Sequence, residues 1–187
     1  NEPTGLPGGA APQRVTIEQT RRYDRPGPRY TSYPTAVEFH EGFGSDAYAA
    51  ALRDASASDE PLSLYLHLPF CEARCLYCAC NVVITPHTAV AEPYLDYLER
   101  EADLVAAELG THRPVAQLHL GGGTPTYFSP DQLRDLMMRL RRRFTFADGA
   151  EMALEVDPRV TTRAHLETLA AEGFNRLSLG VQDFDPQ

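Results

Sequence analysis

The sequence predicts an α/β protein with a parallel sheet, and three observations lead to this fold class. Apolar, β-rich segments alternate with amphipathic helical segments from residue 62 onward. The apolar residues of the helical segments recur every three or four positions, and the connections between segments are short. Alternation of this kind indicates parallel strands joined by right-handed crossovers. A doubly wound sheet and part of a (β/α) barrel both fit the pattern.

Four segments are expected to form the strands of this sheet. They are rich in Leu and Val and are bounded by Gly, Pro or polar residues. They cover residues 62–70, 115–123, 152–158 and 176–184. A parallel sheet of four strands has an unpaired edge, which exposes backbone hydrogen-bonding groups. We therefore expect the sheet to continue in residues beyond 187, so that this chain carries only its N-terminal part.

Three helices are expected between the strands, over residues 91–110, 129–144 and 161–174. Ser129 is a suitable N-cap for the second, because Gln132 three residues later completes a capping box. Gly110 and Gly173 end the first and third helices. The arginine-rich run 139–143 is expected to be the solvated face of the second helix.

The segment before the first strand has a different composition. Residues 1–13 are rich in Gly and Pro and are predicted to be a disordered tail. Residues 14–60 are predicted to form an irregular arm with short helices, one capped by Thr16 and another by Ser45. Residues 61–187 then form the sheet domain.

Composition narrows the functional classes. Hydrophobic residues make up 43% and charged residues 23%, so the chain can bury an ordinary core. The net charge of −9 argues against a nucleic-acid partner, which a basic face usually binds. No apolar run approaches the ~20 residues of a membrane span, and residues 1–13 lack the charged and apolar regions expected of a secretory signal. We expect a cytoplasmic protein with no membrane partner.

All four cysteines, Cys71, Cys75, Cys78 and Cys80, lie within ten positions. Such a cluster is more typical of metal ligation or redox chemistry than of a disulfide framework. Three thiolates spaced C-x3-C-x2-C can hold three irons of a 4Fe–4S cluster and leave the fourth iron open. Zinc binding and unligated thiols remain alternatives. Cys80 stands too close to Cys78 for both to ligate one small ion easily.

Each predicted strand carries an unusual feature at its carboxyl end. The cysteines follow the first strand and "GGGTPT" follows the second, whereas "EVDP" and "GVQD" end the third and fourth. Ligands of parallel α/β proteins bind at this end of the strands. The four features are therefore expected to meet on one rim. His67 and His119, within apolar strands, are expected to be core histidines.

Five stretches resemble the oxygen-independent coproporphyrinogen III oxidases of the radical S-adenosylmethionine (SAM) superfamily. They are "GPRYTSYPTA" (27–36), "YLHLPFCEARCLYCACN" (65–81), "LHLGGGTPTY" (118–127), "LEVDPR" (154–159) and "EGFNRLSLGVQDF" (172–184). The resemblance implies a partial (β/α) barrel of the radical SAM type, with about its first four strands. It also implies a radical enzyme of haem biosynthesis, in which a 5′-deoxyadenosyl radical drives decarboxylation of two propionates of coproporphyrinogen III to vinyl groups.

The resemblance also implies roles for individual residues. Cys71, Cys75 and Cys78 match the ligands of the 4Fe–4S cluster. The residues that match contacts to SAM, with two SAM molecules expected at the site, are Tyr65, Tyr77, Gly122, Gly123, Thr124, Glu155 and Gln182. Cys80, Tyr30 and Arg29 are the candidate catalytic residues, with Arg29 as a partner for a substrate propionate because its planar guanidinium matches a carboxylate.

The family further implies an electron donor such as flavodoxin or ferredoxin, and a monomer when the chain is full length. Two alternatives remain from other functional classes. A related haem chaperone would keep the cluster without decarboxylating, but those proteins generally have Phe where Cys80 stands and lack the "PRYTSYPT" arm. A zinc-binding interaction module is the other alternative.

Overall fold

The computed structural model describes residues 16–24, 35–110 and 112–181 of the chain. Its contacts divide the chain into two units, residues 1–42 and 43–187. This division groups the segment 43–60 with the sheet. The boundaries predicted from the sequence, which separate the tail, the arm and the sheet domain after residues 13 and 60, stay predictions.

Among its described residues, the first unit contains one α-helix and one short 3-10 helix. Helix α1 spans Ile17–Tyr23, and η1 spans Ala36–Glu38. The Thr16 side chain accepts a hydrogen bond from the Gln19 backbone N–H, and the Gln19 side chain accepts one from the Thr16 N–H. This reciprocal pair satisfies two N–H groups that the helix cannot satisfy itself. The helix predicted from the Thr16 cap is thereby confirmed.

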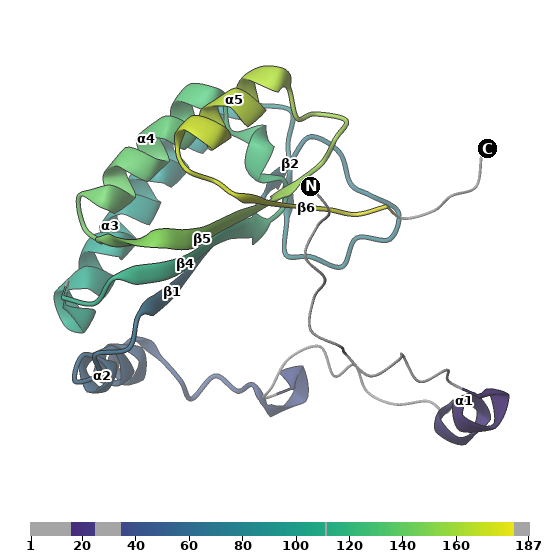
Figure 1. Cartoon of the computed structure of the whole chain (residues 1–187), viewed down its shortest axis with the longest axis horizontal. Coiled ribbons are helices and arrows are strands. Elements are labelled where there is room, and N and C mark those ends of the chain that lie inside the picture. Colours follow the sequence, from purple (N-terminus) through teal and green to yellow (C-terminus); the bar gives the residue numbers. More distant parts are fainter. Residues whose placement is uncertain (1–15, 25–34, 111, 182–187) are drawn as a thin grey trace, which may run out of the picture. The chain divides into compact units, whose positions relative to one another are not determined.

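The second unit is built on a four-stranded parallel sheet. The strands are β1 (Leu62–Leu68), β4 (Val115–Gly122), β5 (Phe146–Val156) and β6 (Arg176–Leu179). They are hydrogen-bonded in the order β1-β4-β5-β6, which is also their order along the chain. The three helices between them cover one face of the sheet (Figure 1). A doubly wound sheet has helices on both faces, so the arrangement is that of a partial (β/α) barrel.

The helices on this face are α3 (Ala91–Leu109), α4 (Pro130–Arg141) and α5 (Arg163–Ala171). Helix α4 begins as predicted, with Ser129 and Gln132 in a capping box and Pro130 at its first position. Short 3-10 turns, η2 (Thr88–Val90) and η3 (Pro125–Tyr127), precede α3 and α4.

Helix α2 spans Ser45–Ala55 and packs beside α3. Its N-cap is Gly44, which makes no side-chain capping bond, so the prediction that Ser45 caps this helix was wrong by one residue. Among the described residues, no helix combines the length and the apolar character needed to cross a bilayer.

The hydrophobic core fills the space between the sheet and its helices. Its most deeply buried members come from the outward-facing residues of the strands and the inner stripes of the helices. They include Leu68, Leu95, Leu118, Leu120, Phe128, Leu133, Leu136, Met137, Leu154 and Leu169. Removing these side chains from water is the main driving force for docking the helices on the sheet.

The opposite face of the sheet is polar. Along each strand, residues alternate between the two faces, and this face carries Tyr65, His119 and Glu155 on β1, β4 and β5. A polar inner face is what a barrel needs to hold a polar ligand.

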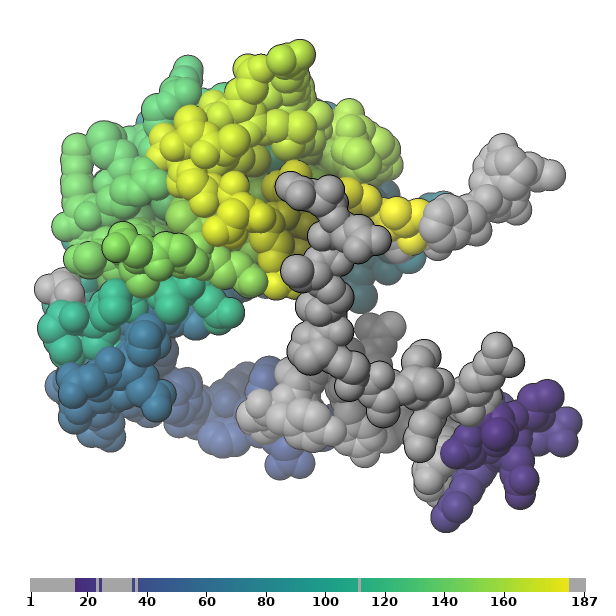
Figure 2. All heavy atoms as spheres, viewed as in Figure 1, coloured from purple at the N-terminus to yellow at the C-terminus, as the bar shows by residue number. Residues whose placement is uncertain are grey.

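At the edge of the sheet, β6 leaves Leu177 and Leu179 about half exposed, and the atoms of β6 lie at the surface in Figure 2.

Ion pairs join α4 to α3. Arg139 contacts Asp96, Glu99 and Asp135 at 2.7–2.8 Å, and Arg143 contacts Glu99 at 2.8 Å. Both arginine side chains are only 15% exposed. The expectation that residues 139–143 form a solvated face was therefore wrong for these two residues, because the acidic residues of α3 lie opposite them.

We expect Arg139→Ala to lower the free energy of unfolding by about 1–3 kcal/mol, since it leaves three carboxylates close together without their shared cation. The exposed neighbour Arg142 provides the control, and Arg142→Ala is expected to change stability by less than about 0.5 kcal/mol. Urea titration of each variant measures the difference. Equal effects of the two substitutions would show that the pairs between α3 and α4 contribute little.

Candidate functional site

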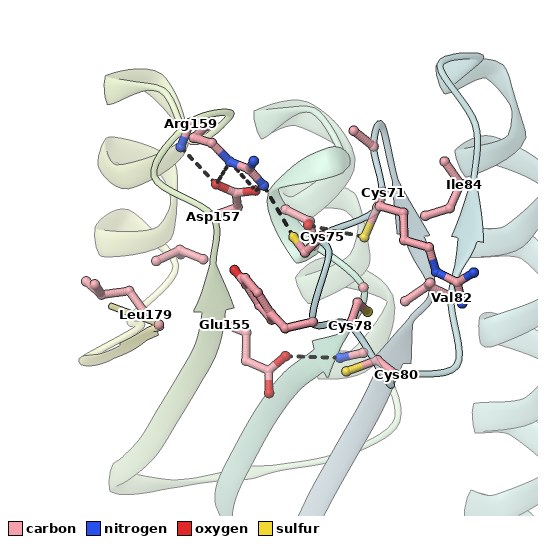
Figure 3. Close-up of a pocket in the computed structure, with 18 of the residues that line it drawn as sticks. Cys71, Cys75, Cys78, Cys80, Val82, Ile84, Glu155, Asp157, Arg159 and Leu179 are labelled. Carbon is pink, nitrogen blue, oxygen red and sulfur yellow. Dashed lines mark hydrogen bonds and ion pairs between the residues drawn. The ribbon is translucent and has the colours of Figure 1, made fainter. Parts of the chain in front are cut away.

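A cavity of about 650 Å³ lies at the carboxyl ends of the strands. It is lined by all four cysteines and by residues at or just after the ends of β4, β5 and β6, including Gly122, Gly123, Thr124, Glu155, Asp157, Arg159 and Gly180. Figure 3 shows the thiols of the cysteine loop facing Glu155, Asp157 and Arg159 across this cavity. The prediction that the features at the strand ends meet on one rim is confirmed for the cysteines, the glycine motif and the end of β5; of the fourth feature, Gly180 lines the cavity, whereas Gln182 and Asp183 lie outside the described residues.

The cysteine loop is closed at its base by a small parallel pair of strands. Strand β2 (Phe70–Cys71) pairs with β3 (Val83–Ile84). The Val83 N–H donates to the Pro69 carbonyl at 2.8 Å, and the Thr85 N–H donates to the Cys71 carbonyl at 2.9 Å. The residues between the two strands, which contain the other three cysteines, are thus anchored at both ends.

Aromatic packing fixes the start of this loop. The Phe70 ring, directly before Cys71, lies 5.2 Å from Tyr94, 5.5 Å from Tyr127 and 5.9 Å from Phe128, measured between ring centroids. Tyr94 on α3 also donates its hydroxyl to the His67 carbonyl at 2.6 Å. Because Phe70 is buried among rings from two other elements, the first cysteine has little freedom to move.

The glycines at the end of β4 let the cysteine loop pack against the sheet. A Cβ at Gly123 would lie 2.7 Å from the backbone of Pro69 and Phe70, and one at Gly122 would lie 2.8 Å from the His67 ring. Gly122 also has a φ of +115°, which other residues rarely adopt. Two hydrogen bonds hold this approach, from the Gly123 N–H to the Leu68 carbonyl and from the Thr124 N–H to the Phe70 carbonyl. The glycine motif therefore holds the cysteine loop against the end of β4, in addition to lining the cavity.

The thiols contact side chains from the strand ends. The Cys71 sulfur lies 3.4 Å from the Thr124 hydroxyl, and the Cys75 sulfur accepts a hydrogen bond of 3.4 Å from Arg159. Burial raises the pKa of the Cys71 thiol, and the hydrogen bond with Thr124 opposes that rise. Loss of solvent also raises the pKa of the Cys80 thiol, and the adjacent Cys78 raises it further. A bound cation would reverse these tendencies, because thiolates are the ligating form.

Glu155 is held at the centre of the polar face. Its Oε2 accepts a hydrogen bond of 3.3 Å from the Gly122 N–H, and its Oε1 lies 3.6 Å from His119 Nε2. The Tyr65 ring stacks on the His119 ring with centroids 5.9 Å apart. Burial raises the pKa of the Tyr65 hydroxyl, and the Glu155 carboxylate raises it further. A Cβ at Gly121 would meet both Tyr65 and Glu155, so this glycine keeps space between them.

The structure gathers most of the residues singled out from the sequence. The cavity is lined by Cys71, Cys75, Tyr77, Cys78, Cys80, Gly122, Gly123, Thr124 and Glu155. Tyr65 lies beside the cavity rather than in its lining, and its hydroxyl contacts His67 Nδ1 at 3.1 Å. Arg29, Tyr30 and Gln182 lie outside the described residues.

The two strand histidines are not core residues. His67 and His119 lie on the polar inner face and are partly exposed. His67 Nε2 bonds to the Asn81 carbonyl at 2.8 Å, which ties β1 to the end of the cysteine loop. The expectation was wrong because neighbouring leucines face the helices, whereas the histidines alternate with them onto the other side of the sheet.

Sequence reasoning assigned no role to Asp157 or Arg159. Both line the cavity, and Arg159 makes a hydrogen-bonded ion pair with Asp157, with Nη2–Oδ2 at 2.6 Å. This guanidinium lowers the pKa of the Asp157 carboxyl. The available signal was their position just after the third strand, two and four residues beyond Glu155.

Comparison with known proteins places this geometry in a family. Residues 65–187 match the model of the radical SAM superfamily. An oxygen-independent coproporphyrinogen III oxidase of Mannheimia haemolytica is 49% identical over 138 residues, which cover 74% of this chain and 92% of that sequence. The chain belongs to this family of radical SAM proteins.

Longer members of the coproporphyrinogen oxidase family extend the match. The Pseudomonas aeruginosa protein is 52% identical over 174 residues, or 92% of this chain and 38% of that protein. A solved structure of the Escherichia coli enzyme, described as a radical SAM enzyme, superimposes with a TM-score of 0.76 at 50% identity. That match covers 83% of this chain and 35% of the other. The chain thus spans little more than a third of these two relatives.

The radical SAM family uses a 4Fe–4S cluster and SAM, and the donor set here fits that cluster. Three thiols on one anchored loop face the same cavity. Three thiols on one loop can each bind a different iron of such a cluster, so the residues that line the cavity fit the cofactor of this family.

Proposed function

We propose that this protein carries out, within its full natural chain, the oxygen-independent oxidative decarboxylation of two propionates of coproporphyrinogen III to vinyl groups, giving protoporphyrinogen IX. The observation that supports it most is the meeting of the C-x3-C-x2-C thiols with Glu155 and the glycine motif in one cavity. Relatives that are 49–52% identical to this chain over the matched residues carry the name of this oxidase.

A bound cluster and SAM would supply one-electron cleavage of the sulfonium and hence a 5′-deoxyadenosyl radical that can abstract hydrogen from the β-carbon of a propionate. In this proposal Cys71, Cys75 and Cys78 hold the cluster. The substrate radical would then lose carbon dioxide and pass its remaining electron to a one-electron acceptor, which leaves a vinyl group. The residues of this chain bind, orient and shield the reactants.

Glu155 is proposed to bind a cationic group of SAM. Its carboxylate is oriented by the Gly122 N–H and by His119, and it faces the cavity that the thiols line (Figure 3). A carboxylate fixed in this way needs little reorganisation on binding, which strengthens its interaction with a positive ligand group. Gly122, Gly123 and Thr124 would present backbone and hydroxyl groups beside it.

The number of SAM molecules is the finer part of the proposal. We propose two, shared among the residues assigned to SAM. Tyr77 lies on the cysteine loop and lines the cavity, whereas Tyr65 lies on the sheet beside Glu155. Two aromatic rings on separate elements give two apolar surfaces on which cofactor groups could pack. Gln182 is assigned to the same set from the family motif alone.

The substrate carries several carboxylates, while this chain has a net charge of −9. Local cations must therefore bind it. We propose Arg29 as one of them and Tyr30 as its neighbour in substrate contact, with Cys80 acting at the cavity in turnover. An arginine fork can bind a propionate through two hydrogen bonds, which a lysine cannot do.

We propose flavodoxin or ferredoxin as the electron donor and a monomer as the state of the full chain. Four unpaired cysteines and a reducible cluster are best kept in a reducing compartment, so we propose the cytoplasm.

The test is to incubate the full natural chain, reconstituted anaerobically with iron and sulfide, with reductant, SAM and coproporphyrinogen III. We expect 5′-deoxyadenosine and protoporphyrinogen IX, both measured by chromatography. Absence of both products from protein that carries a complete cluster contradicts the proposal. Haem binding without vinyl products would instead favour the chaperone, and stoichiometric zinc with no iron uptake would favour an interaction module.

A further inference from the structure

Arg159 connects the end of β5 to a thiol of the cysteine loop. Its Nη2 atom lies 3.4 Å from the Cys75 sulfur and 2.6 Å from Asp157 Oδ2 (Figure 3). The two residues are 84 positions apart in the sequence and belong to different elements. A cationic N–H group therefore points at one of the sulfurs assigned to the cluster.

Asp157 fixes the direction of this contact. Its two carboxylate oxygens accept hydrogen bonds from Arg159 Nε at 3.0 and 3.2 Å, and Oδ1 also accepts from the Arg159 backbone N–H at 3.0 Å. The Asp157 carbonyl in turn accepts from the Thr161 N–H at 3.0 Å, which closes the turn between β5 and α5. The arginine is thus held by its own loop, and its outer nitrogen is presented to Cys75.

We propose that Arg159 is a positioning residue that donates a hydrogen bond to the Cys75 thiolate and thereby raises the reduction potential of the cluster. The inference rests on the proposed assignment of Cys75 as a cluster ligand. Reduction adds negative charge that spreads over the coordinating sulfurs. A cationic donor at one sulfur stabilises the reduced form more than the oxidised form, and hydrogen bonds to sulfur are a recognised determinant of cluster potential.

The surroundings of the other thiols make Arg159 distinct. Cys71 has a neutral hydroxyl as its partner, from Thr124 at the end of β4. Among the hydrogen bonds of the described residues, the one from Arg159 is the only one that brings a cation to a thiol. We therefore expect the Arg159–Cys75 hydrogen bond to affect the cluster potential more than the Thr124–Cys71 contact does, because its donor also carries a positive charge.

The experiment measures the midpoint potential of the reconstituted full chain by redox titration followed with electron paramagnetic resonance. We compare the unmodified protein with Arg159→Met, which removes donor and charge, and with Arg159→Lys, which keeps the charge. Arg163→Met is the matched control, because Arg163 is exposed on α5 and pairs with Glu167. Arg159→Met is expected to shift the midpoint potential to more negative values with iron content unchanged. Arg159→Lys is expected to give a smaller shift in the same direction. The control is expected to have the potential of the unmodified protein.

An intact cluster with the same potential in Arg159→Met and the unmodified protein would overturn the inference. Loss of iron from both Arg159 variants would also overturn it, because it would give the residue a structural role in holding the loop. Absence of a cluster from every protein, the control included, would instead overturn the proposed function on which the inference rests.

Discussion

Replacing Cys71, Cys75 or Cys78 by serine is expected to remove nearly all iron from the reconstituted protein, whereas Cys80→Ser leaves the cluster assembled and impairs turnover. A serine hydroxyl is a poor substitute for a thiolate toward iron, because soft sulfur ligands suit iron–sulfur clusters. Iron and sulfide are measured per chain, and 5′-deoxyadenosine and protoporphyrinogen IX are measured in parallel. The four substitutions are nearly equal in size, so they serve as controls for one another.

The structure makes this division a demanding test. All four thiols line the same cavity, and Cys78 lies close enough to Cys80 to raise the pKa of the Cys80 thiol. Cys80 differs in being exposed, while the other three are partly buried on the loop anchored by β2 and β3. If Cys80→Ser loses iron as fully as the other variants, the division into three ligands and one catalytic thiol is wrong.

Gly123→Ala is expected to destabilise the unit by about 1–3 kcal/mol and to reduce iron uptake sharply. Its Cβ would lie 2.7 Å from the backbone of Pro69 and Phe70, which lead directly into Cys71. A backbone cannot rotate away as a flexible side chain can, so the cysteine loop must move off the end of β4. Thermal or urea unfolding measures stability, and iron per chain measures whether the loop still binds the cluster.

Two other glycines separate steric displacement from backbone effects. An added Cβ at Gly44 or Gly149 meets no atom within 4 Å, but Gly149 has a φ of +74°. Gly149→Ala should therefore cost about 1–2 kcal/mol through its backbone conformation alone and leave iron uptake unchanged. Gly44→Ala should cost about 1 kcal/mol or less. Normal iron content in Gly123→Ala would show that the loop does not depend on this close approach.

Much of the fold was predictable from local patterns. Apolar spacing located α3, α4 and α5, and the Ser129–Gln132 capping box located the start of α4, because both signals depend on residues close together in the sequence. The error at Ser45 also has a local origin. Serine is a good cap, but the turn before α2 places Gly44 at that point without a side-chain bond.

The errors at His67, His119 and Arg139 have another cause. Local sequence shows that a residue alternates with leucines or lies in a charged run, but not which face another element covers. His119 faces the polar side of the sheet because β4 and its neighbours bury their other faces against the helices. Arg139 is paired because the acidic residues of α3 lie across from it.

The sequence by itself determined the α/β class, the thiol spacing and the presence of a polar or Gly-rich feature after each strand, because these depend on residues close together along the chain. The tertiary structure decided between a barrel and a doubly wound sheet, since the face that each helix covers depends on contacts between distant segments (Figure 1). It also brought Arg159 to Cys75 and Gly123 against Pro69. Those contacts join residues that follow different strands, and only the packing of the sheet brings them together.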